Sequence, residues 1–152
     1  MRWRRWLPRV RRADDRGASA APPTTVRALR GAITVDRDEP DAIREATEAL
    51  LIELARRNAV RPAQVISAIF TVTDDLRSAF PAAAARALGW RDVPLLCATE
   101  IPVPDALPRC VRVLLHVEWP ATGRAPRHAY LGGAAGLRPE LAETFSDSAR
   151  AP

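Results

Sequence analysis

The sequence predicts a single α+β domain in which a mixed β-sheet carries helices on one face. It has 152 residues, of which 47% are apolar and 27% charged, enough length and apolar content for one packed core. Apolar positions follow strand-like and helix-like periods in the order β-α-β-α-β-β-β. Helices on one side leave the other sheet face to be covered, and oligomerisation is the simplest way to cover it.

The first two elements carry the clearest patterns. A strand is predicted over 26–35, where Leu29, Ile33 and Val35 on one side alternate with Ala28, Arg30 and Thr34 on the other. A charged turn leads to Pro40, which suits the first turn of a helix. The segment 41–58 has apolar residues at helical spacing and no internal Gly or Pro, and this pattern is the clearest helix signal in the chain.

The remaining elements are shorter. A buried strand is predicted over 64–72, with Val65, Ile66, Ile69 and Val72 inside. An Ala-rich helix over 82–88 lies between Pro81 and Gly89. Three strands follow at 93–97, 109–119 and 128–131, and the glycine-rich run at 132–136 is predicted to be flexible.

The two ends of the chain differ from the body. Residues 1–25 form an Arg- and Pro-rich extension, 26–141 the folded domain, and 142–152 a flexible C-terminal tail. The net charge is +5, and residues 1–16 hold seven Arg against two Asp, so all of the excess lies there. A neutral body does not support nucleic-acid binding. The extension is interpreted as disordered or as translated sequence upstream of a start near Val26, with a cationic surface-binding arm as the alternative.

Several kinds of site are excluded by composition. The chain has no Lys, which removes a phosphate-loop lysine and a Schiff-base lysine. Its two His and two Cys do not form a zinc set of the usual spacing, and no metal is expected. No nucleophile elbow and no dinucleotide fingerprint is present. Cys97 and Cys110 do not make a disulfide framework, which favours a reducing compartment, the cytoplasm. No apolar run reaches the roughly 18 residues of a membrane span, so no membrane partner is expected.

Charged residues in apolar surroundings indicate a binding site. Arg30 and Arg112 interrupt apolar strands, Glu100 follows an apolar segment, and Arg86 lies on the Ala-rich helix. For any one Arg, a solvated strand face is the simpler interpretation. Together with Tyr130, however, these residues predict a pocket for a small ligand with carboxylates, because guanidinium groups pair with carboxylates in a bidentate manner. Without a nucleophile or a base, such a pocket can act by electrostatic stabilisation and conformational capture.

A set of short motifs resembles a known family. The motifs are RGAITV at 30–35, FPA at 80–82 followed by Arg86, GW..VP at 89–94, Cys97 with Glu100, CVRV at 110–113, H.YL at 128–131 and LRP at 137–139. In this order, over about 26–141, they resemble the monofunctional chorismate mutases of the Bacillus (AroH) type. The resemblance implies rearrangement of chorismate to prephenate on the route to Phe and Tyr, without cofactor or metal. It also implies a homotrimeric pseudo-barrel with active sites between subunits.

The resemblance also implies a role for each matching residue. Arg112 would face the breaking ether oxygen, where negative charge grows, and Glu100 would contact the ring hydroxyl and balance Arg112. Arg30 and Tyr130 would hold a substrate carboxylate, with Cys97 near the site. The walls and rim would come from Phe80, Leu137, Arg86 and Arg138.

Three departures from the family pattern have consequences. Ala83 stands where the family has a Lys, which removes one rim cation and is expected to weaken substrate capture. The glycines of 132–136 replace an apolar strand and are expected to loosen the segment before Arg138. Cys97 and Glu100 are three residues apart, so an unbroken pleat would send them to opposite faces. If both line one cleft, the chain must bulge near 98–99.

Two other functions compete with the mutase. A trimeric imine deaminase-like or carboxylate-binding protein of similar architecture would need one Arg at its cleft, whereas this chain offers Arg30, Arg112 and Glu100 together. A binder acting through residues 1–25 would lose affinity steeply with salt, and its binding would vanish when those residues are deleted.

Overall fold

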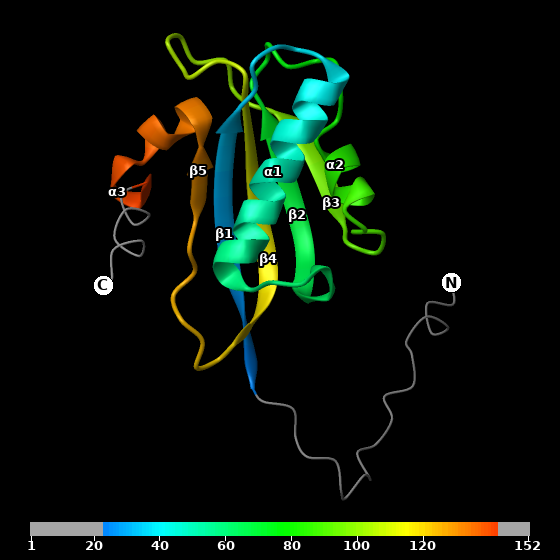
Figure 1. The fold of residues 1–152 in the computed structure, drawn as a ribbon, viewed down its shortest axis with the longest axis vertical. Helices are drawn as coiled ribbons and strands as arrows, with labels where there is room; N and C mark the ends of the chain where they lie inside the picture. Colours follow the sequence, from blue (N-terminus) through cyan, green and yellow to red (C-terminus); the bar gives the residue numbers. More distant parts are fainter. Residues whose placement is uncertain (1–22, 143–152) are drawn as a thin grey trace, which may run out of the picture.

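The centre of the molecule is a five-stranded sheet with the strand order β3-β2-β4-β1-β5 (Figure 1). The computed structural model describes residues 23–142. Its strands are β1 (Thr24–Thr34), β2 (Val65–Val72), β3 (Leu95–Thr99), β4 (Cys110–Pro120) and β5 (Ala129–Leu131). Its helices are α1 (Pro40–Asn58), α2 (Ala82–Ala87) and α3 (Pro139–Ala142), with 3₁₀ turns η1 (Pro62–Gln64) and η2 (Gly132–Leu137). Both the predicted order of elements and the mixed sheet are confirmed.

The extension predicted over 1–25 and the tail predicted over 142–152 lie outside the described residues, except for 23–25 and 142. Thr24 and Thr25 already pair with Pro120 and Trp119. The sheet therefore begins two residues before the predicted start of the first strand.

The sheet is built on a long antiparallel pair. β1 pairs with β4 over the full length of both strands, in a register that places Ala32 opposite Arg112. β2 lies antiparallel on the other side of β4, while the edge strands β3 and β5 run parallel to β2 and β1 respectively. Because paired residues share a face of the sheet, this register fixes which side chains meet.

Helix α1 packs across one face of the sheet, in front of β1 and β4 in Figure 1. Its buried stripe includes Ile43, Leu50, Leu51 and Leu54. Gly31 of β1 lets the helix approach closely, since a Cβ added there would lie 2.9 Å from Cδ1 of both Leu50 and Leu54. The helix ends at Asn58 because Ala59 takes a left-handed conformation, with φ 52°.

The hydrophobic core lies between this helical layer and the sheet. The shorter α2 covers the same face near β2 and β3 (Figure 1). The largest core cluster joins Leu29, Phe70, Val113, Leu115 and Trp90. The predicted alternation in the first strand is confirmed, because Leu29 is fully buried while Arg30 is exposed.

Two local predictions are wrong. Ile66 was expected inside the second strand but is 41% exposed, because the register shifts between Val65 and Ser67 and the buried positions fall on Ala68 and Phe70. The glycine-rich run at 132–136 forms the 3₁₀ turn η2 rather than a flexible segment. Its start is tied to the sheet by the Gly133 amide, which donates to Thr34 Oγ1 at 2.8 Å.

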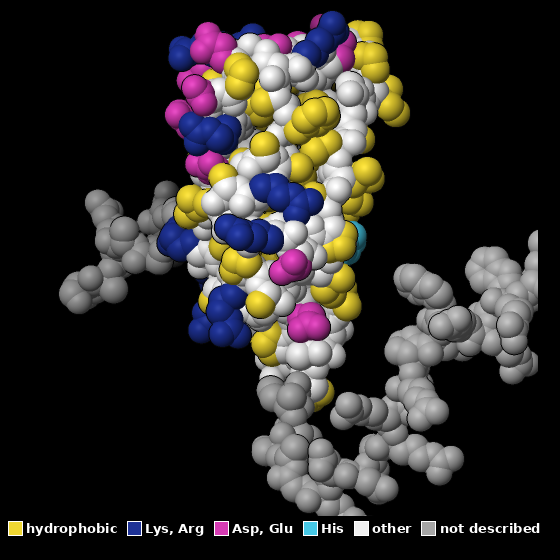
Figure 2. Space-filling view, turned by 90° about the vertical axis from the view of Figure 1, so that its right-hand side faces the viewer, with side chains coloured by type: hydrophobic (Ala, Val, Ile, Leu, Met, Phe, Trp, Pro, Cys, Tyr) yellow, Lys and Arg dark blue, Asp and Glu magenta, His cyan; other side chains and the backbone are white. Residues whose placement is uncertain are grey.

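The face of the sheet opposite α1 is covered by neither α1 nor α2; of the described residues, η2 covers its β1–β5 end, where Ala134 packs against Ala32, Cys110 and Tyr130. In Figure 2 the molecule is seen from the β3 side, and hydrophobic side chains gather along the right-hand margin, which is this uncovered face. Val26 and Leu96, both 59% exposed, belong to it by strand alternation.

Candidate functional site

A row of register partners crosses the face of the sheet opposite α1, half-buried at Thr71 and Arg112 and buried beneath η2 at Ala32 and Tyr130. Thr71 of β2 lies opposite Arg112 of β4, Arg112 opposite Ala32 of β1, and Ala32 opposite Tyr130 of β5. Arg30 is two residues from Ala32 on the same strand, so it shares that face. The sheet therefore brings Arg112, Arg30 and Tyr130 to one surface, as the sequence predicts for a carboxylate pocket.

Arg112 and Glu100 form an ion pair at one end of this row. The Arg112 guanidinium donates to Glu100 Oε2, and Thr71 Oγ1 donates to Glu100 Oε1 at 2.5 Å. The side chains of Arg112 and Glu100 are 31% and 15% exposed, so the pair is mostly shielded but reaches solvent. A half-shielded guanidinium held by a carboxylate is suited to face a developing negative charge on a bound ligand.

Cys110 precedes Arg112 by two residues on β4, shares its face of the sheet and is fully buried. Burial raises the pKa of its thiol, while the Arg112 guanidinium opposes the rise. Cys110 packs with Ala32, Tyr130 and Ala134 in a small cluster of its own. A protonated, buried thiol in this position supports the packing of Tyr130 rather than chemistry.

The other end of the row holds a second group of predicted residues. Arg30 is exposed, and its backbone amide donates to His128 Nδ1 at 3.1 Å. Arg138 pairs with Glu140 at 2.5 Å, and Leu137 is 38% exposed. Burial, aided by the charges of Arg30 and Arg138, lowers the pKa of His128 below its ordinary value.

Phe80 and Cys97 lie together, but on the other side of the sheet. They line a cavity of about 350 Å³ with Leu76 and Pro81, and Phe80 is 76% exposed. Cys97 is the register partner of the buried Phe70, which places it on the helix-covered face.

Pairing stays regular through the end of β3. Thr99 pairs with Val72, and the Glu100 amide donates to the Val72 carbonyl at 2.9 Å. The bulge considered near 98–99 does not occur, so the pleat sends Cys97 and Glu100 to opposite faces. Within one chain these two residues do not share a cleft.

Arg86 is also distant from Arg112 within the chain. It lies on α2, and its Nη1 donates to the carbonyls of Trp90 at 3.3 Å and Arg91 at 2.7 Å. The nine predicted site residues thus divide between the two faces. Arg112, Glu100, Arg30 and Tyr130, with Arg138 and Leu137 after β5, belong to the uncovered side, whereas Phe80, Cys97 and Arg86 belong to the helical side.

Two polar partners in the site were not predicted. Thr71 holds Glu100, and its only sequence signal is a hydroxyl at an outward position of the second strand. His128 enters the sequence analysis only through the H.YL motif, and its ring accepts a hydrogen bond from the Arg30 amide. Neither contact follows from spacing, because each depends on the register between strands that are distant in sequence.

Within residues 23–142, no group of three His, Cys, Asp or Glu is arranged to hold a metal ion. No helix in that part of the chain is long and apolar enough to cross a membrane.

The fold and the candidate site together place guanidinium groups and a carboxylate on one face of a mixed sheet, an arrangement suited to a small anionic ligand. The family model for chorismate mutase type I matches residues 26–141. Chorismate mutase AroH of Thermus thermophilus is 50% identical over 117 residues, which cover 76% of this chain and 96% of that protein. Chorismate mutase AroH of Bacillus subtilis (strain 168) is 38% identical over 120 residues, covering 78% and 94%.

A solved structure agrees with these relatives. The chorismate mutase from Clostridium thermocellum is similar with a TM-score of 0.69 and 45% identity, over 72% of this chain and 98% of that one. The chain belongs to the chorismate mutase type I family.

Proposed function

We propose that the chain rearranges chorismate by holding it between copies of itself, with the uncovered sheet face of one copy opposite the Phe80 side of the next. As a member of its family the chain is a chorismate mutase, an isomerase that converts chorismate to prephenate in aromatic amino acid biosynthesis. The observation that carries the mechanism is the Arg112–Glu100 pair at the end of the cross-strand row.

The reaction needs no proton transfer to an enzyme group, because one bond breaks and another forms within a single molecule. The chain's task is to select the folded conformer of a flexible dianion and to stabilise charge that grows on the breaking ether oxygen. Arg112 supplies the cation at that oxygen. Arg30 and Tyr130 bind a carboxylate at the other end of the row, and Glu100 receives the ring hydroxyl while it keeps Arg112 in place.

The division of residues between two faces supports a site shared by neighbouring copies. Phe80, Cys97 and Arg86 cannot meet Arg112 within one chain, since they lie on the helical side of the sheet. In a closed ring of identical copies, one surface meets a different surface of the next copy. A homotrimer of this kind brings the two groups together and also covers the exposed Val26 and Leu96. Leu137 and Arg138 then form a wall and rim of the same pocket.

The cytoplasm is the proposed location. Both cysteines, Cys97 and Cys110, are free thiols, which supports a reducing compartment.

The direct test is the loss of chorismate absorbance on adding the purified chain in the absence of added metal or cofactor, with prephenate as the product. Turnover supports the proposal, and failure to turn over chorismate contradicts it. The mass of the assembly in solution tests the trimer.

Mixed assemblies test the shared site. Arg112→Ala and Arg86→Ala chains are each expected to lose most activity. When the two are unfolded together and refolded at equal amounts, about a quarter of the sites receive both native arginines if the copies mix at random. Recovery toward a quarter of the parent turnover supports a site between copies, whereas a mixture no better than its components contradicts it.

A further inference from the structure

His128 connects the site to the helical layer although it is not part of the proposed pocket. The backbone amide of Arg30 donates to its Nδ1 at 3.1 Å. A backbone N–H can only donate, so Nδ1 carries no proton in this arrangement, and the ring proton of the neutral imidazole is on Nε2. The contact directly precedes the first paired residues of β1 and β5, Gly31 and Ala129. The ring therefore extends the β1–β5 pairing by one hydrogen bond.

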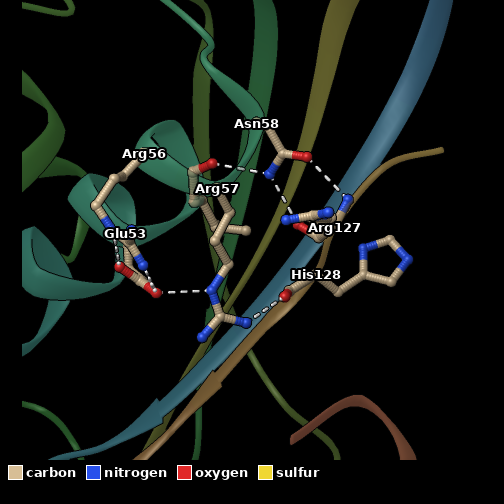
Figure 3. Close-up of polar contacts among 7 residues, drawn as sticks. Glu53, Arg56, Arg57, Asn58, Arg127 and His128 are labelled. Carbon is tan, nitrogen blue, oxygen red and sulfur yellow. Dashed lines mark hydrogen bonds and ion pairs between the residues drawn. The ribbon is translucent and has the colours of Figure 1, made fainter. Parts of the chain in front are cut away.

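The backbone around His128 is held by the end of α1 (Figure 3). Arg57 donates through Nη1 to the His128 carbonyl at 2.7 Å, and its Nε donates to Glu53 Oε1 at 2.7 Å. Asn58 donates to the Arg127 carbonyl at 2.7 Å and accepts from the Arg127 amide at 2.8 Å. Because these bonds fix the His128 backbone, the ring has a defined place from which to hold Arg30.

Several charged and titratable groups on neighbouring elements surround this position. Arg30 of β1 and Arg138 after η2 act on the ring, and Arg57 of α1 binds the His128 carbonyl. Tyr130 of β5 and Glu140 of α3 act on Arg138. Glu140 is paired with Arg138. Partial burial and the charges of Arg30 and Arg138 all favour the neutral imidazole, the form that the Arg30 hydrogen bond requires.

We propose that His128 is a positioning residue for Arg30, which its neutral ring holds in place for the substrate carboxylate and releases when the ring gains a proton. This inference rests on the proposed function, in which Arg30 binds that carboxylate. Protonation places a second donor opposite the Arg30 amide and ends the hydrogen bond. Substrate capture then weakens on the acid side of neutrality, while Arg112 and Glu100, at the other end of the row, are unaffected.

Two substitutions test separately the hydrogen-bond acceptor that His128 provides and the titration of its ring. His128→Asn keeps an oxygen near the place of Nδ1 but does not titrate, whereas His128→Phe keeps a ring but has no acceptor. His116 is the only other histidine of the chain, and its Nδ1 lies 3.0 Å from Ser67 Oγ. His116→Asn is therefore the matched control.

Steady-state kinetics between about pH 5 and 8 give the first readout. For the parent and for His116→Asn, we expect KM to rise as the pH falls through the pKa of His128, with kcat nearly constant. For His128→Asn we expect a KM that does not depend on pH in this range. For His128→Phe we expect a KM about tenfold above the parent at neutral pH, the order of one lost hydrogen bond, and no acid limb.

A second readout does not depend on activity. NMR of the parent follows the ring of His128, assigned by its absence in His128→Asn, and the amide of Arg30. We expect both signals to titrate with one pKa, below the ordinary value of about 6.5. An acid limb that persists in His128→Asn, a parental KM in His128→Phe, or an Arg30 amide that ignores the His128 titration would overturn the inference. A parent chain that leaves chorismate unchanged refutes the proposed function instead, and the NMR titration still tests the hydrogen bond.

Discussion

Replacing Arg112 by Ala tests the central electrostatic claim. Among residues 23–142, Arg112 is the ion-pair partner recorded for Glu100, whose side chain is only 15% exposed. In the proposed site the substitution therefore removes the cation that faces the ether oxygen, and it leaves the shielded Glu100 carboxylate without this partner beside a bound dianion. One donor aimed at a developing oxyanion is worth about 3–4 kcal/mol, and the unpaired Glu100 adds to this loss. We expect kcat to fall at least about a thousandfold.

The pattern of the kinetic constants is as informative as the size of the loss. In the proposed site Arg30 and Tyr130 still hold the substrate carboxylate in this variant, so we expect KM to change much less than kcat. Arg112→Lys keeps the charge without the fork of donors and should fall between the parent and Arg112→Ala. Arg27→Ala, which removes an exposed Arg from the same sheet on the helical face, is the control and should resemble the parent.

The assay is the decrease of chorismate absorbance, with unfolding by urea measured in parallel to confirm that each variant is folded. Turnover of Arg112→Ala within tenfold of the parent would refute the assigned role. A loss seen equally in Arg27→Ala would point to a general effect of charge on the assembly rather than to the site.

Three further predictions concern stability and chain organisation. Gly31→Ala places a methyl group 2.9 Å from Cδ1 of Leu50 and Leu54, so we expect a loss of about 1–3 kcal/mol in the free energy of unfolding by urea, and an unchanged midpoint would contradict this packing. Glu53 has its pKa lowered from 4.5 to about 2 by Arg56 and Arg57, so its stabilising effect is complete above about pH 4.5 and disappears as the pH falls toward 2. Glu53→Gln should therefore lower the free energy of unfolding by about 1 kcal/mol at neutral pH, a modest loss because solvent screens the ion pairs. The difference in unfolding free energy between parent and variant should become smaller at acid pH, and a difference that stays constant would contradict the assignment. Removing residues 1–22 should leave kcat/KM within about twofold, because every assigned site residue lies later in the chain, and a loss above tenfold would give that segment a role in catalysis.

The fold was predictable from sequence wherever one local period dominated. Strand alternation around Leu29 and Arg30 and the apolar stripe of α1 defined the elements and their buried faces within one or two residues. The prediction failed at Ile66, because a register shift between strands has no signal in the periodicity of one strand. It also failed at 132–136, where the contact of Gly133 with Thr34 depends on a strand almost a hundred residues away.

Residues for the candidate site were chosen from the sequence, whereas their arrangement could be obtained only from the structure. Charges placed in apolar strands identified Arg30, Arg112 and Glu100, and the structure brings the last two into contact. Because Cys97 and Glu100 are three residues apart, an unbroken strand was expected to turn them to opposite faces of the sheet. The regular pairing of β3 confirms that they lie on opposite faces. The partners Thr71 and His128 required the three-dimensional register, since neither forms a motif with the residue it holds.

The antiparallel register of β1 and β4 links folding to catalysis in one more way. The alternation that turns Leu29 and Val113 toward α1 is the same alternation that turns Arg30 and Arg112 outward. A slip of one residue would exchange the two sets, burying guanidinium groups while exposing leucine and valine. Misaligned chains would therefore be unstable as well as inactive, so a well-folded but catalytically silent population is not expected to accumulate. For this enzyme, a measurement of the folded fraction should also serve as a measurement of the active fraction.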